Sequence, residues 1–184
     1  ITSKTDVYGN TTTYEYDVFG RPSKVTNPYD GSSSYGTISY WYLDFGIVGN
    51  QKMVTYNTEK NGTAQYLWEE AYFDGLGRTI KTRGEGPDGK VIVGQTTYNQ
   101  RGLAATKSLP YFEGLETPRY VTFEYDPVGR ITRTTNPDNT FTKTIYRKER
   151  TTFIDANDHK KLEEKDAYGR LVSVEEYTGV GGNY

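Results

Sequence analysis

The chain has 184 residues, enough for one domain of ordinary size, and its 22 basic and 24 acidic residues leave a net charge of −2. This balance, with no long block of one sign, argues against a general nucleic-acid or acidic-membrane surface. No stretch approaches the roughly 18 apolar residues of a transmembrane helix, and the lack of cysteine excludes disulfides, zinc–thiolate sites and cysteine catalysis.

The composition favours β-structure. The sequence contains 18 Tyr and 20 Gly together with abundant Thr. Tyr and Thr suit a pleated, half-buried surface, and Gly and Pro mark turns. We therefore expect an all-β fold.

A short motif recurs along the chain, in which Asp or Asn is followed three residues later by Gly. Its first residues are Asp6, Asp17, Asp74, Asn99, Asp126 and Asp166, and its last residues are Gly9, Gly20, Gly77, Gly102, Gly129 and Gly169. Arg follows the Gly in four copies, as Arg21, Arg78, Arg130 and Arg170. An aromatic residue precedes the motif in four copies, as Tyr16, Phe73, Tyr98 and Tyr125. A degenerate copy begins at Asp155 and has Asp158 in place of the Gly.

The motif predicts a β-hairpin turn. Asp at the first position of a type I turn can accept the backbone N–H two residues on. Gly at the fourth position can take the left-handed conformation that closes a hairpin with a bulge. The residue after Gly then pairs with the Asp, which places Arg21 by Asp17 and Arg130 by Asp126, and likewise Arg78 by Asp74.

The flanking residues alternate as half-buried strands do. Tyr14 and Tyr16 share one face and are expected to face a core, and Val121, Phe123 and Tyr125 share a face opposite Thr122 and Glu124. The Pro-containing segments "NPYDG", "GPDG" and "NPDN" indicate turns that end the second strand of each repeated hairpin.

Two segments contain good helix formers but run directly into a hairpin turn, so we predict strands at 63–73 and 159–166. The stretch between Pro28 and Phe73 is the least regular. We expect it to hold two or three longer strands, including the aromatic segment 35–45.

These motifs resemble those of a known repeat family. Tyr-Asp-x-x-Gly-Arg, with its best copies in "EYDVFGRP", "AYFDGLGR" and "EYDPVGR", resembles the RHS or YD repeat of bacterial polymorphic toxins, insecticidal toxin complexes and animal teneurins. The "DGLGR" copy and the long irregular insert look more like the B/C components of insecticidal toxin complexes, and teneurins are more distant. "NQRGL" and "DANDHK" depart from the consensus.

The resemblance implies repeated antiparallel hairpins in a curved continuous sheet, an arc of a hollow shell that encloses or presents a C-terminal toxin or effector. It implies a secreted or cell-surface location in bacteria, with neighbouring repeats, an encapsulated toxin and another toxin-complex component as partners. The resemblance covers essentially the whole chain, so we expect residues 1–184 to be a single repeat region. Because the sequence starts at Ile1 without Met, we expect it to be a fragment of a larger protein.

Several apparent chemical sites fit turns better. Gly84, Gly86 and Gly89 match a dinucleotide-binding spacing, but a predicted strand follows where a helix is needed. The segment from Asp155 lacks the Gly and Glu of a calcium loop, and we expect His159, the only histidine, on the surface.

Asp126-Pro suggests self-cleavage by resemblance to RHS toxins. Arg130 stands where the family's cleavage motif has Leu, and repeats continue beyond it, so we expect an ordinary hairpin turn here rather than a cleavage site. Adjacent acids such as Glu69 and Glu70 point to opposite faces of a strand and form no catalytic pair. We therefore predict a non-enzymatic protein without cofactor or metal.

An alternative function is an aromatic surface that binds glycans or a protein partner. Its candidate residues are Tyr40, Trp41, Tyr42, Tyr66 and Trp68. We favour a packed face for these side chains, because hydrophobic strand faces are usually core. We also expect the isolated repeat region to self-associate through unpaired strand edges.

Overall fold

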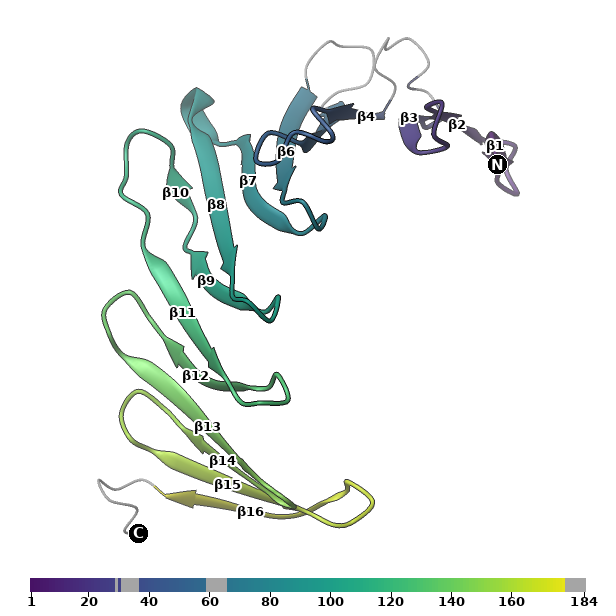
Figure 1. Cartoon of the computed structure of the whole chain (residues 1–184). Helices are drawn as coiled ribbons and strands as arrows, with labels where there is room; N and C mark the ends of the chain where they lie inside the picture. Colours follow the sequence, from purple (N-terminus) through teal and green to yellow (C-terminus); the bar gives the residue numbers. More distant parts are fainter. Residues whose placement is uncertain (29, 31–36, 59–65, 178–184) are drawn as a thin grey trace. The chain divides into compact units, whose positions relative to one another are not determined.

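The computed structural model describes residues 1–28, 30, 37–58 and 66–177. Over these residues it contains sixteen β-strands and one 3-10 turn, η1 (Pro87–Gly89) (Figure 1). No helix in this part of the chain is long and apolar enough to cross a membrane. The expected all-β class, built from repeated antiparallel hairpins, is confirmed.

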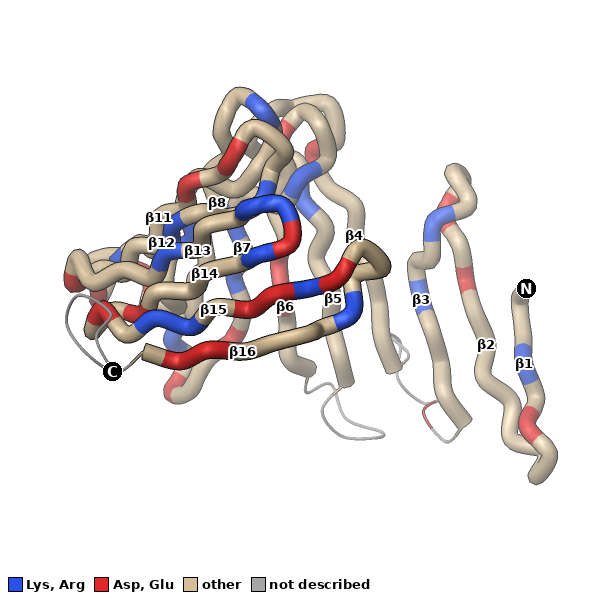
Figure 2. The backbone as a smooth tube through the Cα atoms, turned by 90° about the horizontal axis from the view of Figure 1, so that it is seen from below, with Lys and Arg blue, Asp and Glu red and all other residues tan. Residues whose placement is uncertain are grey.

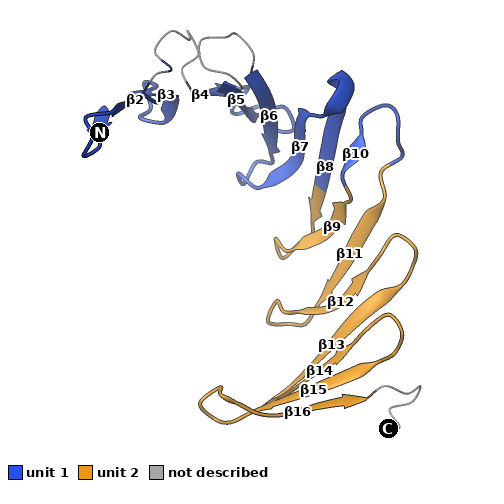
Figure 3. Cartoon of the chain, turned by 180° about the vertical axis from the view of Figure 1, so that it is seen from behind, with its two compact units in different colours: residues 1–95, 110–117 blue, residues 96–109, 118–184 orange. Residues whose placement is uncertain are grey.

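The chain forms two compact units (Figure 3). Unit 1 comprises Ile1–Gln95 and Pro110–Thr117, and unit 2 comprises Thr96–Leu109 and Pro118–Tyr184. Unit 1 contains β1 (Ser3–Thr5), β2 (Thr11–Tyr16), β3 (Pro22–Thr26), β4 (Ile38–Leu43), β5 (Lys52–Thr58), β6 (Tyr66–Phe73), β7 (Thr79–Glu85), the first part of β8 (Val91–Tyr98) and β10 (Tyr111–Phe112). Unit 2 contains the end of β8, β9 (Ala104–Ser108), β11 (Tyr120–Tyr125), β12 (Ile131–Thr135), β13 (Phe141–Arg147), β14 (Arg150–Ile154), β15 (Lys160–Lys165) and β16 (Leu171–Tyr177).

Strand pairing follows the order of the sequence, and every pair is antiparallel. The exception is β10, which lies in the connection between β9 and β11 and pairs back onto β8. There Tyr111 stands opposite Val93 and Phe112 opposite Ile92. This return of a short strand was not predicted, because two strand residues in "LPYFEG" give no recognisable alternation.

The longer strands expected between Pro28 and Phe73 are present as β4, β5 and β6. The segments with good helix formers are strands too, as β6 and β15, so those predictions are confirmed for the described residues. Residues 63–65 and 35–36 of the predicted strands lie outside the described residues. Cross-strand pairing on both edges of β6 and β15 outweighs the modest helix propensity of their Glu, Lys and Leu residues.

The expected core is largely missing. Among the described residues, Val54 and Val93 are the buried apolar side chains, at 4% and 0% exposure. Tyr16 is 43% exposed, so the prediction that it faces a core is wrong, while Tyr14 is half-buried. The reason is architectural: the strands of each unit pair side by side in one sheet, and among the described residues no second layer of strands or helices covers either face.

Alternation along the strands is nevertheless clear. In β11, Val121, Phe123 and Tyr125 are half-buried, whereas Thr122 and Glu124 are exposed, as predicted. In β6, Glu69 is exposed and Glu70 is buried, which confirms that these adjacent acids point to opposite faces.

Candidate functional site: repeat turns and a polar network

Each copy of the recurrent motif occupies a tight turn between consecutive strands. In the six copies with Gly, the Gly N–H donates to the carbonyl of the first residue at 2.9–3.1 Å. The Gly φ angles are between 76° and 92°, the left-handed region that a side chain disfavours. The first residue also donates its own N–H to the carbonyl after Gly, as Asp126 does to Arg130 at 2.9 Å.

The Asp carboxylate binds three donors of its own turn. Asp126 Oδ1 accepts the N–H of Val128 at 3.0 Å and that of Arg130 at 2.9 Å. Asp126 Oδ2 accepts the Arg130 Nε at 2.7 Å. The same three contacts occur in the turns of Asp17, Asp74 and Asp166. The bond to the N–H two residues on was expected; the one four residues on was not.

These contacts perturb the carboxylates. Desolvation acts to raise the pKa of Asp126, but the N–H and guanidinium of Arg130 outweigh it and hold that pKa below its usual value. The pKa of Asp166 is lowered by its bonds to Arg170. With both oxygens occupied by donors of its own turn, Asp126 is held as a turn carboxylate.

Two turns reach the same geometry with different residues. Asp155 Oδ1 accepts the His159 N–H at 2.9 Å, and His159 Nδ1 lies 3.0 Å from Oδ2, so His159 takes the place of the Arg on an exposed surface, as expected. Asp158 stands at the Gly position with φ of 63°. The "NPDN" turn is a further copy, with the Asn139 N–H donating to Asn136 O at 3.0 Å and φ of 67°.

Bulges separate two kinds of turn. After five of them the strand carries one extra residue, three positions beyond the Gly: Ser23, Ile80, Ala105, Thr132 and Val172. The turns that begin at Asp6, Asn136 and Asp155 have no such shift. Successive hairpins open toward opposite ends of a sheet, so within each unit the bulged turns share one end and the regular turns share the other. A bulge bends its strand and increases the local twist.

The residue after the turn Gly contacts the following strand. The guanidinium carbon of Arg21 lies 4.0 Å from the ring centre of Tyr42 on β4, and that of Arg130 lies 4.1 Å from the ring centre of Tyr146 on β13. Both pairs follow from register: continuing from Lys24 opposite Ser39 by three residues brings Arg21 opposite Tyr42. These are cation–π contacts that link a turn to its neighbour.

The Asn99 turn keeps the pattern without an Arg. Continuing the register from Thr106 opposite Thr122 by three residues brings Leu103 opposite Tyr125. The Tyr125 hydroxyl donates to Ala104 O at 2.8 Å. Arg101, inside this turn, donates to the carbonyls of Asp126 and Pro127 at 2.8 and 2.7 Å. Adjacent turns of unit 2 are therefore bonded directly.

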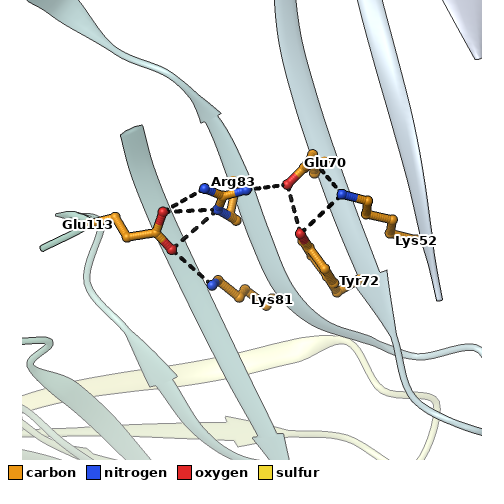
Figure 4. A network of polar contacts seen from close by, with 6 residues as sticks. All are labelled: Lys52, Glu70, Tyr72, Lys81, Arg83 and Glu113. Carbon is orange, nitrogen blue, oxygen red and sulfur yellow. Dashed lines mark hydrogen bonds and ion pairs between the residues drawn. The ribbon is translucent and has the colours of Figure 1, made fainter. Parts of the chain in front are cut away.

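A network of charged side chains crosses unit 1 (Figure 4). At its centre Glu70 is 8% exposed and accepts Lys52 Nζ at 2.6 Å, Arg83 Nη1 at 2.6 Å and the Tyr72 hydroxyl at 2.8 Å. Arg83 continues to Glu113, with Nη2 at 2.6 Å from Oε2.

Strand register brings these residues together. Glu70 stands opposite Val54 on one side and Arg83 on the other, so they share a face. Glu113 comes from the segment after β10 and also accepts Lys81 Nζ at 3.0 Å. Sequence reasoning missed this network, because its bonded pairs are up to 32 residues apart in the sequence and β10 gave no signal.

The network fixes protonation states. Burial acts to raise the pKa of Glu70, but hydrogen bonds from Lys52, Arg83 and Tyr72 hold it below its usual value. Bonds from Arg83 and Lys81 lower the pKa of Glu113, and the bond to Glu70 raises that of Lys52. Both carboxylates stay ionised and paired, which suits a structural cross-link rather than a general base.

The candidate aromatic residues divide into covered and exposed ones. Tyr42 lies beneath Arg21, and Trp68 lies 5.7 Å from the Arg83 guanidinium carbon. Tyr56 contacts Tyr66 edge-on at 4.9 Å between ring centres and Trp41 at 6.2 Å. Trp41 itself remains 49% exposed. Tyr42 and Trp41 are neighbours on β4 and so lie on opposite faces, and packing around the candidate aromatic residues is partial.

The motifs that suggested cofactor or calcium chemistry are turns. Gly86 precedes η1, Gly89 is its last residue, and β8 begins at Val91, as the turn interpretation required. Within the described ranges no three His, Cys, Asp or Glu side chains are grouped to hold a metal ion.

Comparisons with known proteins agree with this geometry. Residues 1–32 match the family model described as RHS Repeat. No curated protein matches the sequence. The crystal structure of TcdB2-TccC3 aligns with a TM-score of 0.77 at 16% identity, over 96% of this chain and 12% of that chain.

Two further structures are similar. The Photorhabdus luminescens Tc holotoxin pore with a substituted TccC3 gives a TM-score of 0.76 at 13% identity, over 96% of this chain and 15% of that one. TcdB2-TccC3 without its hypervariable C-terminal region gives 0.68 at 13% identity, over 95% and 16%. The resemblance read from the sequence is confirmed to this extent: residues 1–32 match the RHS Repeat model, and the fold is similar to that of toxin-complex structures. The chain spans only 12% of the length of the first structure.

Proposed function

We propose that this chain is a structural repeat segment of a secreted or surface-displayed bacterial toxin-type protein. In that protein it forms part of a β-sheet shell that encloses or presents a C-terminal toxin or effector. Residues 1–184 are then one continuous repeat region of a longer chain, and they have no catalytic role of their own.

One observation carries the proposal: the repeated turn, with its Asp–Arg pair, recurs between strands that pair in sequence order, in the fold of toxin-complex structures. Such a chain adds wall area one hairpin at a time, since each unit needs only its neighbours. The polar network agrees with this role, because both of its carboxylates are occupied by cations.

Limited proteolysis of the full-length gene product tests the proposal. The segment C-terminal to the repeats is expected to resist protease while the repeats are intact. The double variant Asp74→Ala/Asp126→Ala removes the carboxylate from one turn in each unit and is expected to make that segment cleavable. Glu15→Ala, which removes an exposed ion pair with Lys24, is the matched control. Digestion of the C-terminal segment in the unaltered protein would refute the enclosing role.

A second candidate function rests on Trp41. Its half-exposed ring lines a shallow groove of unit 1 together with Lys24 and Ser39, an arrangement of apolar and polar groups that suits a sugar. Binding to a glycan array that is lost in Trp41→Ala would support this function. Retention of binding by the variant would remove Trp41 from it.

The partners that we propose are neighbouring repeats, an enclosed toxin and another toxin-complex component. On its own, the repeat region is expected to self-associate through its free strand edges. Sedimentation velocity that shows a single monomeric species across a wide concentration range would contradict this expectation.

A further inference from the structure

The groove of unit 1 that Trp41 lines opens where β3 and β4 separate. These strands are joined by two residue pairs, whereas β4 and β5 are joined by six. Pro22 has no backbone N–H to donate and Ser23 is the extra residue of a bulge, which explains why the pairing does not continue toward the Asp17 turn. The groove has a volume of about 570 Å³, the size of a small-molecule site.

A row of polar side chains crosses this groove. Ser39 and Trp41 are two residues apart on β4, and Lys24 stands opposite Ser39, so these three side chains lie on one face. Glu15 on β2 stands opposite Lys24, and its carboxylate lies 3.3 Å from the Lys24 ammonium. All four residues line the groove, so that Glu15, Lys24 and Ser39 form a polar row beside the ring of Trp41.

The hydroxyl of Ser39 is a buried polar group without a partner. Ser39 is 4% exposed, and its Oγ makes no hydrogen bond with any of the described residues. A buried hydroxyl that bonds nothing costs free energy, and such groups are few in folded proteins. Ser39 Oγ is therefore an atom in the wall of the groove that a ligand hydroxyl would satisfy.

The charges that line the groove cancel. They belong to Glu15, Asp17, Arg21 and Lys24, which form two ion pairs, Asp17–Arg21 at 2.7 Å and Glu15–Lys24 at 3.3 Å. In Figure 2, β2 and β3 carry an acidic and a basic residue side by side, and the neighbouring β4 carries no charged residue. An ionised ligand would compete with one of these pairs, whereas a neutral ligand would leave both intact.

Trp41 adds an apolar wall to this polar row. Its ring is 49% exposed and contacts Tyr56 edge-on at 6.2 Å between ring centres. The face of an aromatic ring is electron-rich and attracts weakly positive C–H groups, such as those on the face of a pyranose. Sugar hydroxyls both donate and accept, so they suit Lys24, which only donates, Glu15, which only accepts, and Ser39, which does both.

We propose that the groove between β3 and β4 binds a neutral pyranose, with the C–H face of the sugar against Trp41 and one of its hydroxyls bonded to Ser39 Oγ. The inference rests on the second candidate function, the binding of glycans, and deepens it in two respects. It specifies an uncharged sugar, and it assigns to Ser39 the recognition of a hydroxyl group, while Lys24 and Glu15 bind further hydroxyls and stay paired with each other.

Ligand-observed saturation-transfer NMR on the full-length gene product tests the choice of ligand. The probes are the methyl glycosides of glucose, galactose and mannose, each compared with the uronic acid glycoside that carries a carboxylate at C6. At least one neutral glycoside is expected to bind. Its uronic acid counterpart should bind about three- to tenfold more weakly, because its carboxylate meets Glu15 and Asp17 and finds no unpaired cation.

Two variants test the residues. Ser39→Ala removes an unsatisfied hydroxyl, so the variant should resist proteolysis at least as well as the unaltered protein, yet it should bind the neutral glycoside about three- to tenfold more weakly. Ser173→Ala, in unit 2, is the matched serine control and should bind normally. Glu15→Gln leaves Lys24 without its carboxylate partner and should reduce or reverse the preference for the neutral sugar over the uronic acid.

The outcomes separate the inference from the function on which it rests. Binding that Trp41→Ala abolishes but Ser39→Ala leaves unchanged would overturn the inference and leave the glycan function of Trp41 standing. Tighter binding of a uronic acid than of its neutral counterpart would overturn it too. No binding of any neutral glycoside at about 50 mM would remove both the inference and the monosaccharide site. None of these readouts involves an enclosed segment, so the enclosing role is tested by proteolysis alone.

Discussion

The strands β5–β8 of unit 1 and the hairpins β11–β16 of unit 2 keep the same antiparallel order by different means. Unit 1 has strands of seven or eight residues here, joined across one face by the network around Glu70. Unit 2 has strands of five to seven residues and repeats its turns more regularly. Four threonines of unit 2 stand in register across neighbouring strands, Thr97, Thr106, Thr122 and Thr135, and the Oγ1 atoms of the first two are 2.7 Å apart.

The difference shows two ways to stabilise a sheet without a second layer. In unit 2 the turn carboxylates bond groups within four residues, and longer bonds such as that of Arg101 to Asp126 O join adjacent turns. In unit 1 the bonds of the network connect residues far apart in the sequence, such as Arg83 and Glu113. We therefore expect unit 1 to respond most to changes in its network and unit 2 to changes in its turns.

The largest effect is expected for Glu70→Ala. The substitution leaves the partly buried Lys52 without its carboxylate partner and leaves Arg83 with Glu113 alone, which should lower the free energy of unfolding by about 2–3 kcal/mol. Trp41 and Trp68 are the only tryptophans and both lie in unit 1, so tryptophan fluorescence in urea reports this unit. Glu15→Ala, which removes a surface pair with Lys24, should change stability by under about 1 kcal/mol. Equal effects of both variants would deny the network its special role.

The next effect concerns the turns. Gly129 has φ of 92°, so Gly129→Val forces a β-branched side chain into the left-handed region and should cost about 2 kcal/mol. The loss should appear in amide hydrogen exchange of β11 and β12, while the tryptophan transition of unit 1 stays in place. Gly77→Val is the matched change in unit 1, with φ of 77°, and should shift the tryptophan transition. A shift of that transition by Gly129→Val would show that the two units unfold together.

Acid should weaken unit 1 through Glu70 and Glu113. Their pKa values are lowered in the folded chain, so the stability that they contribute is present above their unfolded pKa of about 4.3 and is lost as pH falls through the folded values. The tryptophan-detected free energy of unfolding should therefore decline by about 1 kcal/mol or more between pH 5 and pH 3. Glu70→Gln should flatten this decline, and an unchanged slope would exclude Glu70 as its source.

The smallest effect is a gain. Asp158 occupies the Gly position of its turn with φ of 63°, so Asp158→Gly should relieve strain and stabilise the β14–β15 hairpin by about 0.5–1 kcal/mol. Slower hydrogen exchange in β14 and β15 would show the gain. The matched change Asn139→Gly should act in the same direction, since Asn139 has φ of 67°. A loss of protection in both variants would mean that their side chains contribute more than the strain costs.

The fold was readable from the sequence to the extent that it depends on local chemistry. The motif that begins at Asp126 and ends at Gly129 encodes its turn within four residues. The two segments rich in helix-forming residues were assigned correctly as strands because each runs into such a turn. The exposure of Tyr16 was not readable, since alternation identifies a face but not what covers it. Glu113 was missed because its position depends on β10 returning to β8.

The bulge that follows a turn also sets the phase between that turn and the next strand. Without the extra residue Thr132, Arg130 would come opposite Ile145 rather than Tyr146. A related sequence that loses this residue should therefore carry its aromatic residue one position earlier. Turn, bulge and tyrosine would then change together, although Arg21 and Tyr42 are 21 residues apart in the sequence. The unit that evolution duplicates would then be longer than the hairpin and would end on the neighbouring strand.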